Sequence, residues 1–168
     1  GSPVARRRRY ASPGRARARA ALYRAIRERF GTDTGVWIGR VGKLRQGLHR
    51  DSYVADVEVS YSQEDAVGLR LVAEVPRRDS DQDVDVRARR LPAVIARLAS
   101  MRLSFRTPSW ALAVTEGGRA VVVRDLVPGF PVKLRADWNP NFSPWEIAGR
   151  IAAEVHAVDV TPLATVLP

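Results

Sequence analysis

The first apolar pattern in the chain has the period of a helix. Leu22, Ile26 and Phe30 recur every four residues, which places them on one narrow face of a helix. A Ser-Pro pair before this stripe and a glycine after it are typical of a helix start and a helix end. We therefore expect an Arg-rich amphipathic helix over residues 13–31.

From residue 35 the pattern changes to the alternation of a β-strand. Apolar and polar residues alternate roughly in three segments that are separated by turn-forming sequences. The expected strands cover residues 36–44, 52–60 and 69–75.

A second helical pattern follows a polar loop at residues 77–85. Residues 86–101 have helical spacing, but Pro92 lies within them. Proline is tolerated in the first turn of a helix and not in its interior, so we expect this helix to begin near Arg90. Its apolar side would hold Val94, Ile95 and Leu98.

The last third of the chain predicts a hairpin and a final helix. Apolar strands at residues 110–116 and 119–127 flank a Gly-Gly turn. After a loop, Ser143 and Pro144 form a favourable helix start. The order is then helix, three strands, helix, two strands, linker and helix, which indicates an α+β fold with a five-stranded antiparallel sheet and one inserted helix.

The net charge of +10 is concentrated at the N-terminus. Residues 1–30 contain ten Arg and one Glu, whereas the remainder has 18 basic and 17 acidic residues. Residues 1–12, which open with a Gly-Ser pair typical of a cleaved tag, are expected to be a disordered basic tail. The basic arm is either a solvated tail or a site for nucleic acid, an anionic membrane or an acidic partner. Its candidate anion-binding residues are Arg6, Arg7, Arg8, Arg9, Arg15, Arg17 and Arg19.

The composition excludes several kinds of site. The chain has no Cys and two His, which argues against disulfides, thiolate chemistry and structural zinc, and suits a reducing cytoplasm. No apolar run approaches the roughly 20 residues that cross a bilayer. Gly42-Lys43 lacks the spacing of a phosphate-binding P-loop.

Three segments together resemble a known family. They are VVVRDLVPGFP at 121–131, AAEVHAVD at 152–159 and RTPSW at 106–110. In this order they are similar to the N-terminal lobe of the aminoglycoside phosphotransferase-like kinases, which have the protein-kinase-like fold. The resemblance covers residues 35–160. It divides the chain into an N-lobe at 35–135 and a post-hinge loop and helix at 136–168.

This resemblance implies binding of ATP or GTP with Mg²⁺. Leu126 and Val127 would be the hinge whose backbone bonds the purine, and Val72 would cover the base. Gly47 would lie in the bend of a phosphate-covering loop, and Asp125 matches an acid that the family usually has before the hinge. The position of the cation that the phosphates need is occupied by Glu74. The expected cofactor-binding set is Gly47, Val72, Glu74, Asp125, Leu126 and Val127.

The catalytic residues of the family have no counterpart in this chain. Its catalytic loop needs a His-x-Asp segment followed by an Asn, but His156 and Asp159 are one residue too far apart and both Asn residues precede them. The resemblance therefore implies a nucleotide-binding lobe that is not catalytic on its own and whose partner is a missing C-terminal lobe or another protein. The alternative is a degenerate lobe that acts as a non-catalytic binding or regulatory module. Either form would expose the face that normally packs on the second lobe, so some self-association is expected.

Glu74 has two interpretations. In the simpler one it is a surface carboxylate that meets solvent or pairs with a nearby Arg. In the other it forms a reversed ion pair with Arg89 or Arg90 of the inserted helix, which would hold the helix but repel phosphate. The resemblance implies that Glu74→Lys raises the affinity for ATP.

Overall fold

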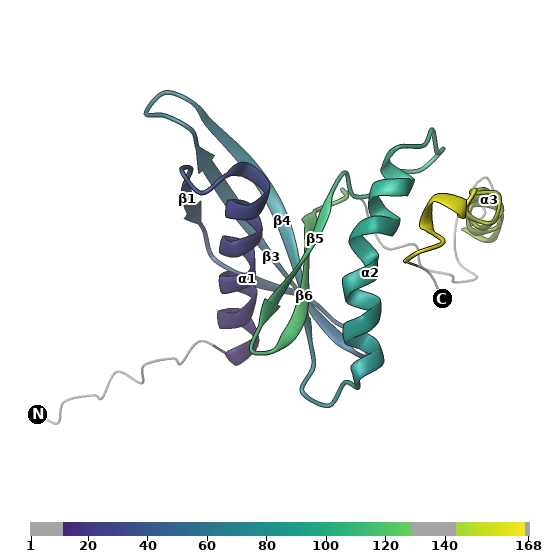
Figure 1. Ribbon diagram of the computed structural model, residues 1–168, viewed down its shortest axis with the longest axis horizontal. Helices are drawn as coiled ribbons and strands as arrows, with labels where there is room; N and C mark the ends of the chain where they lie inside the picture. Colours follow the sequence, from purple (N-terminus) through teal and green to yellow (C-terminus); the bar gives the residue numbers. More distant parts are fainter. Residues whose placement is uncertain (1–11, 129–143, 167–168) are drawn as a thin grey trace, which may run out of the picture.

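The computed structural model describes residues 12–128 and 144–166, and residues 1–11 of the predicted tail at 1–12 lie outside them (Figure 1). The described elements are α1 Pro13–Phe30, β1 Gly35–Ile38, β2 Gly42–Gln46, β3 Arg50–Ser60, β4 Ala66–Pro76, α2 Gln82–Ala99, β5 Ala111–Glu116, β6 Arg119–Asp125, α3 Pro144–His156 and the 3₁₀ turn Thr161–Leu163. This order matches the predicted succession of helices and strands, except that four strands precede α2 where three were expected. No helix within the described ranges combines the length and the apolar character that crossing a bilayer would need.

The strands form one antiparallel sheet in the order β1-β3-β4-β6-β5, and β2 also pairs with β3. β1 pairs with the last residues of β3 and β2 with its first residues, so β1 and β2 are two halves of one interrupted edge strand. The sheet is therefore five strands wide, as predicted, in an α+β fold. The single strand expected at 36–44 is wrong, because the chain leaves the strand conformation at Gly39 and donates the Gly39 N–H to the Asp56 carbonyl at 2.9 Å.

One face of the sheet is covered by α1. Five residues of α1 are fully buried, three of them Ala, and the small Ala side chains let the helix lie close to the strands. They pack on alternate residues of the strands, because successive side chains of a strand point to opposite faces. The buried α1 residues are Ala18, Ala21, Leu22, Ala25 and Ile26.

The other face carries α2, over β5 and β6. Ala88 of α2 packs with Ala120 and Val122 of β6, whereas their neighbours Val121 and Val123 belong to the α1 core. Figure 1 shows α1 and α2 on the two sides of the β5–β6 hairpin. Among the described residues, Asp56 and Glu58 of β3 and Arg70 of β4 are exposed beyond α2, so part of this face is open there.

The predicted start of α2 near Arg90 is wrong. The helix begins at Gln82, with the Asp81 side chain accepting a hydrogen bond from the Val84 N–H at 3.2 Å, and Pro92 lies inside it. This N-cap and the acids of the first turn, Asp83 and Asp85, favour the earlier start and outweigh the backbone hydrogen bond that Pro92 cannot donate.

Candidate functional site

The open part of the α2 face contains a hollow of about 290 Å³. Its apolar wall consists of Leu44 of β2, Val54 of β3 and Leu126, the residue that follows β6. Val54 pairs in register with Val72 of β4, which is fully buried. Of the predicted cofactor-binding residues, the lining therefore includes Leu126, whereas the fully buried Val72 is not part of it.

An ion pair lies at the rim of this hollow. The Arg70 Nε donates to Asp56 Oδ1 at 2.8 Å, and both side chains are largely exposed. The hydrogen bond from Arg70 lowers the pKa of the Asp56 carboxyl. The rim is therefore polar and charged, while the wall formed by Leu44, Val54 and Leu126 is apolar.

Glu74 lies on the same face, between two arginines. Its carboxylate is 3.6 Å from Arg50 Nη1 of β3 and 3.4 Å from Arg124 Nη2 of β6, and the three side chains are about one-fifth exposed. The proposed pair with Arg89 or Arg90 of the inserted helix is wrong, because the carboxylate pairs with Arg50 and Arg124, and Arg89 pairs with Asp85 of its own helix at 3.0 Å. The simpler interpretation of Glu74, a carboxylate paired with nearby Arg, is confirmed. Two guanidinium groups surround one carboxylate, so the cluster carries a net positive charge.

Gly47 lies in the tight bend between β2 and β3, as predicted. Its N–H donates to the Arg50 carbonyl at 2.8 Å, and its carbonyl accepts a hydrogen bond from Arg77 at 3.2 Å. A Cβ at this position would lie only 2.3 Å from the Arg50 carbonyl oxygen. The bend therefore requires glycine, and Arg77 fixes the bend to the end of β4.

The residues around the predicted hinge have separate roles. The Asp125 carboxylate accepts hydrogen bonds from the Ser109 N–H at 2.9 Å and the Ser109 hydroxyl at 2.8 Å, which fixes the start of β5. The Leu126 N–H donates to the Arg70 carbonyl at 3.0 Å, so this amide is already used by the sheet. Val127 and Pro128 are the last residues of the first described range, and Gly129 lies outside it. Asp125 is thus a structural anchor in this fold, and Val127 is the next hinge residue with a backbone N–H.

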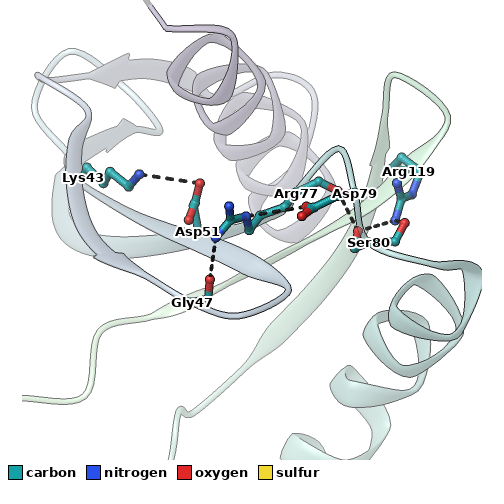
Figure 2. A network of polar contacts seen from close by, with 7 residues as sticks. All are labelled: Lys43, Gly47, Asp51, Arg77, Asp79, Ser80 and Arg119. Carbon is teal, nitrogen blue, oxygen red and sulfur yellow. Dashed lines mark hydrogen bonds and ion pairs between the residues drawn. The ribbon is translucent and has the colours of Figure 1, made fainter.

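A second and larger hollow, of about 790 Å³, lies on the α1 face at the N-terminus of α1. Figure 2 shows polar groups beside it: Lys43 points to Asp51, and Arg77 lies between Gly47 and Asp79 (Figure 2). The hollow has more basic than acidic residues in its lining. Its basic residues are Arg15, Arg17, Lys43, Arg77 and Arg78, and its acids are Asp51 and Asp79.

The predicted basic arm is divided by the structure. Arg15 and Arg17 line the second hollow, whereas the Arg19 guanidinium donates to the carbonyls of Ile38 and Gly39 and holds α1 on β1. Arg6, Arg7, Arg8 and Arg9 lie outside the described residues.

Sequence reasoning missed Arg50, Arg124 and Tyr53. Arg50 and Arg124 meet at Glu74 only through strand register, since Ser52 pairs with Glu74 and Val72 with Arg124, and Tyr53 lies on the opposite face. Register is fixed by long-range pairing that a single sequence does not show. Within residues 12–128 and 144–166, acidic and His side chains form no group of three that could hold a metal ion.

Comparison of the chain with protein-family models, with curated proteins and with solved structures gave no match.

Proposed function

We propose that this chain is the nucleotide-binding lobe of an aminoglycoside phosphotransferase-like small-molecule kinase and is not catalytic on its own. The hollow of about 290 Å³ is the observation that carries this proposal. Its lining includes Leu126, which the resemblance assigns to the hinge, and Val54, which pairs in register with Val72. Its volume is close to the lower end of the roughly 300–1,000 Å³ of small-molecule sites. The strand order supports the same proposal. β5, which follows the inserted helix α2, lies at the edge of the sheet, and the last strand, β6, lies inside it between β4 and β5.

In this proposal the purine lies against Leu44 and Val54, with its edge toward the backbone of Val127. Since the Leu126 N–H is bonded to Arg70, Val127 is the better hinge donor of the two predicted residues. The phosphates extend along β3 toward the bend at Gly47. A γ-phosphoryl transfer to a substrate hydroxyl also needs metal ligands and a base, which the resemblance assigns to a C-terminal lobe.

The charged cluster changes how the phosphates would be held. Glu74 occupies the position of the usual cation, but Arg50 and Arg124 lie on both sides of it. A fixed positive charge is what the phosphates require, and either guanidinium supplies one. We therefore assign the phosphate-binding role on this face to Arg50 and Arg124 in place of residue 74.

Calorimetric titration of Mg-ATP and Mg-GTP into the chain tests this function. We expect weak, saturable binding and no turnover. Leu44→Glu adds a carboxylate to a half-exposed side chain that lines the hollow, and it should weaken binding about tenfold. Val86→Glu, on the exposed side of α2, is the matched control and should bind like the unchanged chain. Turnover by the chain, or equal affinity of the two variants, would contradict the proposal.

The second candidate function is a degenerate lobe that acts as a non-catalytic binding or regulatory module. The observation that favours it is that Glu74 forms ion pairs with both Arg50 and Arg124, so these arginines are paired without a ligand. A basic arm that binds nucleic acid or an acidic partner belongs to this candidate. Thermal unfolding with and without Mg-ATP separates the two functions: the module predicts no shift in the midpoint for the chain or for Glu74→Gln.

A further inference from the structure

The hollow at the N-terminus of α1 collects positive charge that is not neutralised within it. Arg15 and Arg17 are partly buried, and neither has an ion-pair partner among the described residues. Lys43 and Arg77 are only loosely paired, at 3.6 Å, with Asp51 and Asp79 (Figure 2). With Arg78, the five basic residues exceed the two acids, for a net charge of about +3 in the lining.

Tyr53 contributes a second, independent observation. The residue is 4% exposed and lines the hollow, yet its hydroxyl has no hydrogen-bond partner in the described part of the chain. Because this hydroxyl opens on the hollow, it is available to donate a hydrogen bond to a molecule that occupies it.

The helix start adds a backbone donor at the same place. The Ser12 side chain accepts from the Arg15 N–H, and the Ser12 carbonyl accepts from the Ala16 N–H. Pro13 has no N–H, and the Gly14 N–H has no hydrogen-bond partner among the described residues. A Cβ on Gly14 would lie 2.1 Å from the Tyr53 hydroxyl oxygen, so glycine is needed for the helix start to lie against this hydroxyl.

We propose that this hollow binds a small phosphate-bearing ligand. A phosphate supplies several acceptor oxygens and a negative charge, which match the free N–H, the Tyr53 hydroxyl and the unpaired Arg15 and Arg17. The volume of about 790 Å³ is much larger than one phosphate group needs, which favours a ligand with more than one phosphate or with an organic part. The site is distinct from the proposed nucleotide hollow, because the two lie on opposite faces of the sheet. Tyr53 of β3 faces α1, whereas the next residue, Val54, faces the α2 side and lines the nucleotide hollow.

Calorimetric titration of pyrophosphate into the 168-residue chain tests the site. We expect saturable binding with one site per chain. Arg15→Gln and Tyr53→Phe should each weaken it about tenfold, since each removes one charge-assisted or buried hydrogen bond. Arg87→Gln removes the same charge from an exposed position of α2 away from the hollow, and it should leave the affinity unchanged.

Parallel titrations separate the ligand sources. Tighter binding of pyrophosphate than of inorganic phosphate supports a ligand with two phosphates, and equal affinity supports a monophosphate with an organic part. Unchanged pyrophosphate binding by Leu44→Glu keeps this site separate from the proposed nucleotide site. Thermal unfolding of each variant confirms that Arg15→Gln and Tyr53→Phe remain folded.

Three results would overturn the proposal. One is the absence of saturable pyrophosphate binding, and another is equal weakening by Arg15→Gln and Arg87→Gln, which would indicate a response to net charge alone. The third is that the chain binds a single-stranded oligonucleotide more tightly than pyrophosphate, and that Arg15→Gln weakens the binding of the oligonucleotide but not of pyrophosphate. That result would assign these arginines to a nucleic-acid surface.

Discussion

Glu74 illustrates how a single residue changes meaning once its neighbours are known. In the sequence it stands at a position where the family resemblance requires a cation, which makes Glu74→Lys an attractive gain-of-binding substitution. In the structure the carboxylate lies within 3.6 Å of both Arg50 and Arg124. A lysine there would place three positive charges together on a partly buried face, so the first effect of the substitution is on stability.

We predict that Glu74→Lys lowers the free energy of unfolding by about 2–4 kcal/mol, because it leaves two guanidinium groups unpaired and adds a like charge. Glu74→Gln, which keeps the shape and removes the charge, should lower it by about 1–2 kcal/mol. Urea unfolding followed by circular dichroism measures both. A Glu74→Lys variant as stable as the unchanged chain, with higher ATP affinity, would restore the original assignment of this position.

Part of the candidate site follows from local sequence and part does not. Gly47 is predictable because a bend between two alternating segments favours glycine, and Leu126 is predictable because it follows an apolar strand. Arg50 and Arg124 are separated from Glu74 by 24 and 50 residues. Only the pairing of β3, β4 and β6 brings them together, and local patterns do not specify that pairing.

At the scale of elements, α2 is attached to the sheet through its first turn. Asp85 accepts a hydrogen bond from the Ala120 N–H at 2.5 Å and also pairs with Arg89. The hydrogen bond from Ala120, together with Arg89, lowers the pKa of the Asp85 carboxyl below its usual value of 3.8. Because the folded pKa is depressed, the stabilisation is complete above the unfolded pKa and is lost as pH falls through the folded value.

We therefore predict that Asp85→Asn lowers the free energy of unfolding by about 1–2 kcal/mol at neutral pH. The difference from the unchanged chain should shrink as the pH falls below 3.8, where the carboxyl becomes protonated in the unfolded and then in the folded chain. Urea unfolding at a series of pH values measures it. Asp83→Asn is the matched control, because Asp83 lies in the same first turn but is exposed. A pH-independent difference for Asp85→Asn would show that the charge is not what holds the helix.

Pro92 gives a second prediction for α2. The N-terminal part of the helix is capped by Asp81 and continues through Pro92, so the helix forms in spite of the missing N–H. Pro92→Ala restores a donor for the Ala88 carbonyl and removes the ring, and we expect the free energy of unfolding to rise by about 1–3 kcal/mol. Thermal or urea unfolding measures the change. A fall in stability would instead mean that packing of the half-buried ring outweighs the restored hydrogen bond.

At the scale of the whole molecule, α1 belongs to the same core as the sheet. Composition suggests a basic arm that could be removed, because arginine dominates residues 1–30 and apolar residues form only a narrow stripe. The structure shows a broader buried face, in which Ala18, Ala21 and Ala25 accompany Leu22 and Ile26. Alanine contributes little to a hydrophobic pattern in a sequence, so the buried face looks narrower than it is. Its small side chain nevertheless lets the helix lie close to the sheet, and these residues are completely buried.

This difference decides how the basic arm can be tested. Deletion of residues 3–11 removes four arginines and no described contact, so we expect cooperative urea unfolding with little change in midpoint.

Deletion of residues 3–30 also removes α1 and exposes the apolar face formed by residues such as Leu71 and Val123, which are fully buried against it. Loss of Leu22 alone, as Leu22→Ala, should cost about 2–5 kcal/mol, and loss of the whole helix should abolish cooperative unfolding. Cooperative unfolding of the 3–30 deletion would mean that α1 is dispensable. Otherwise, any nucleic-acid binding lost in that deletion reflects loss of the fold, and the 3–11 deletion is the one that isolates the contribution of the tail.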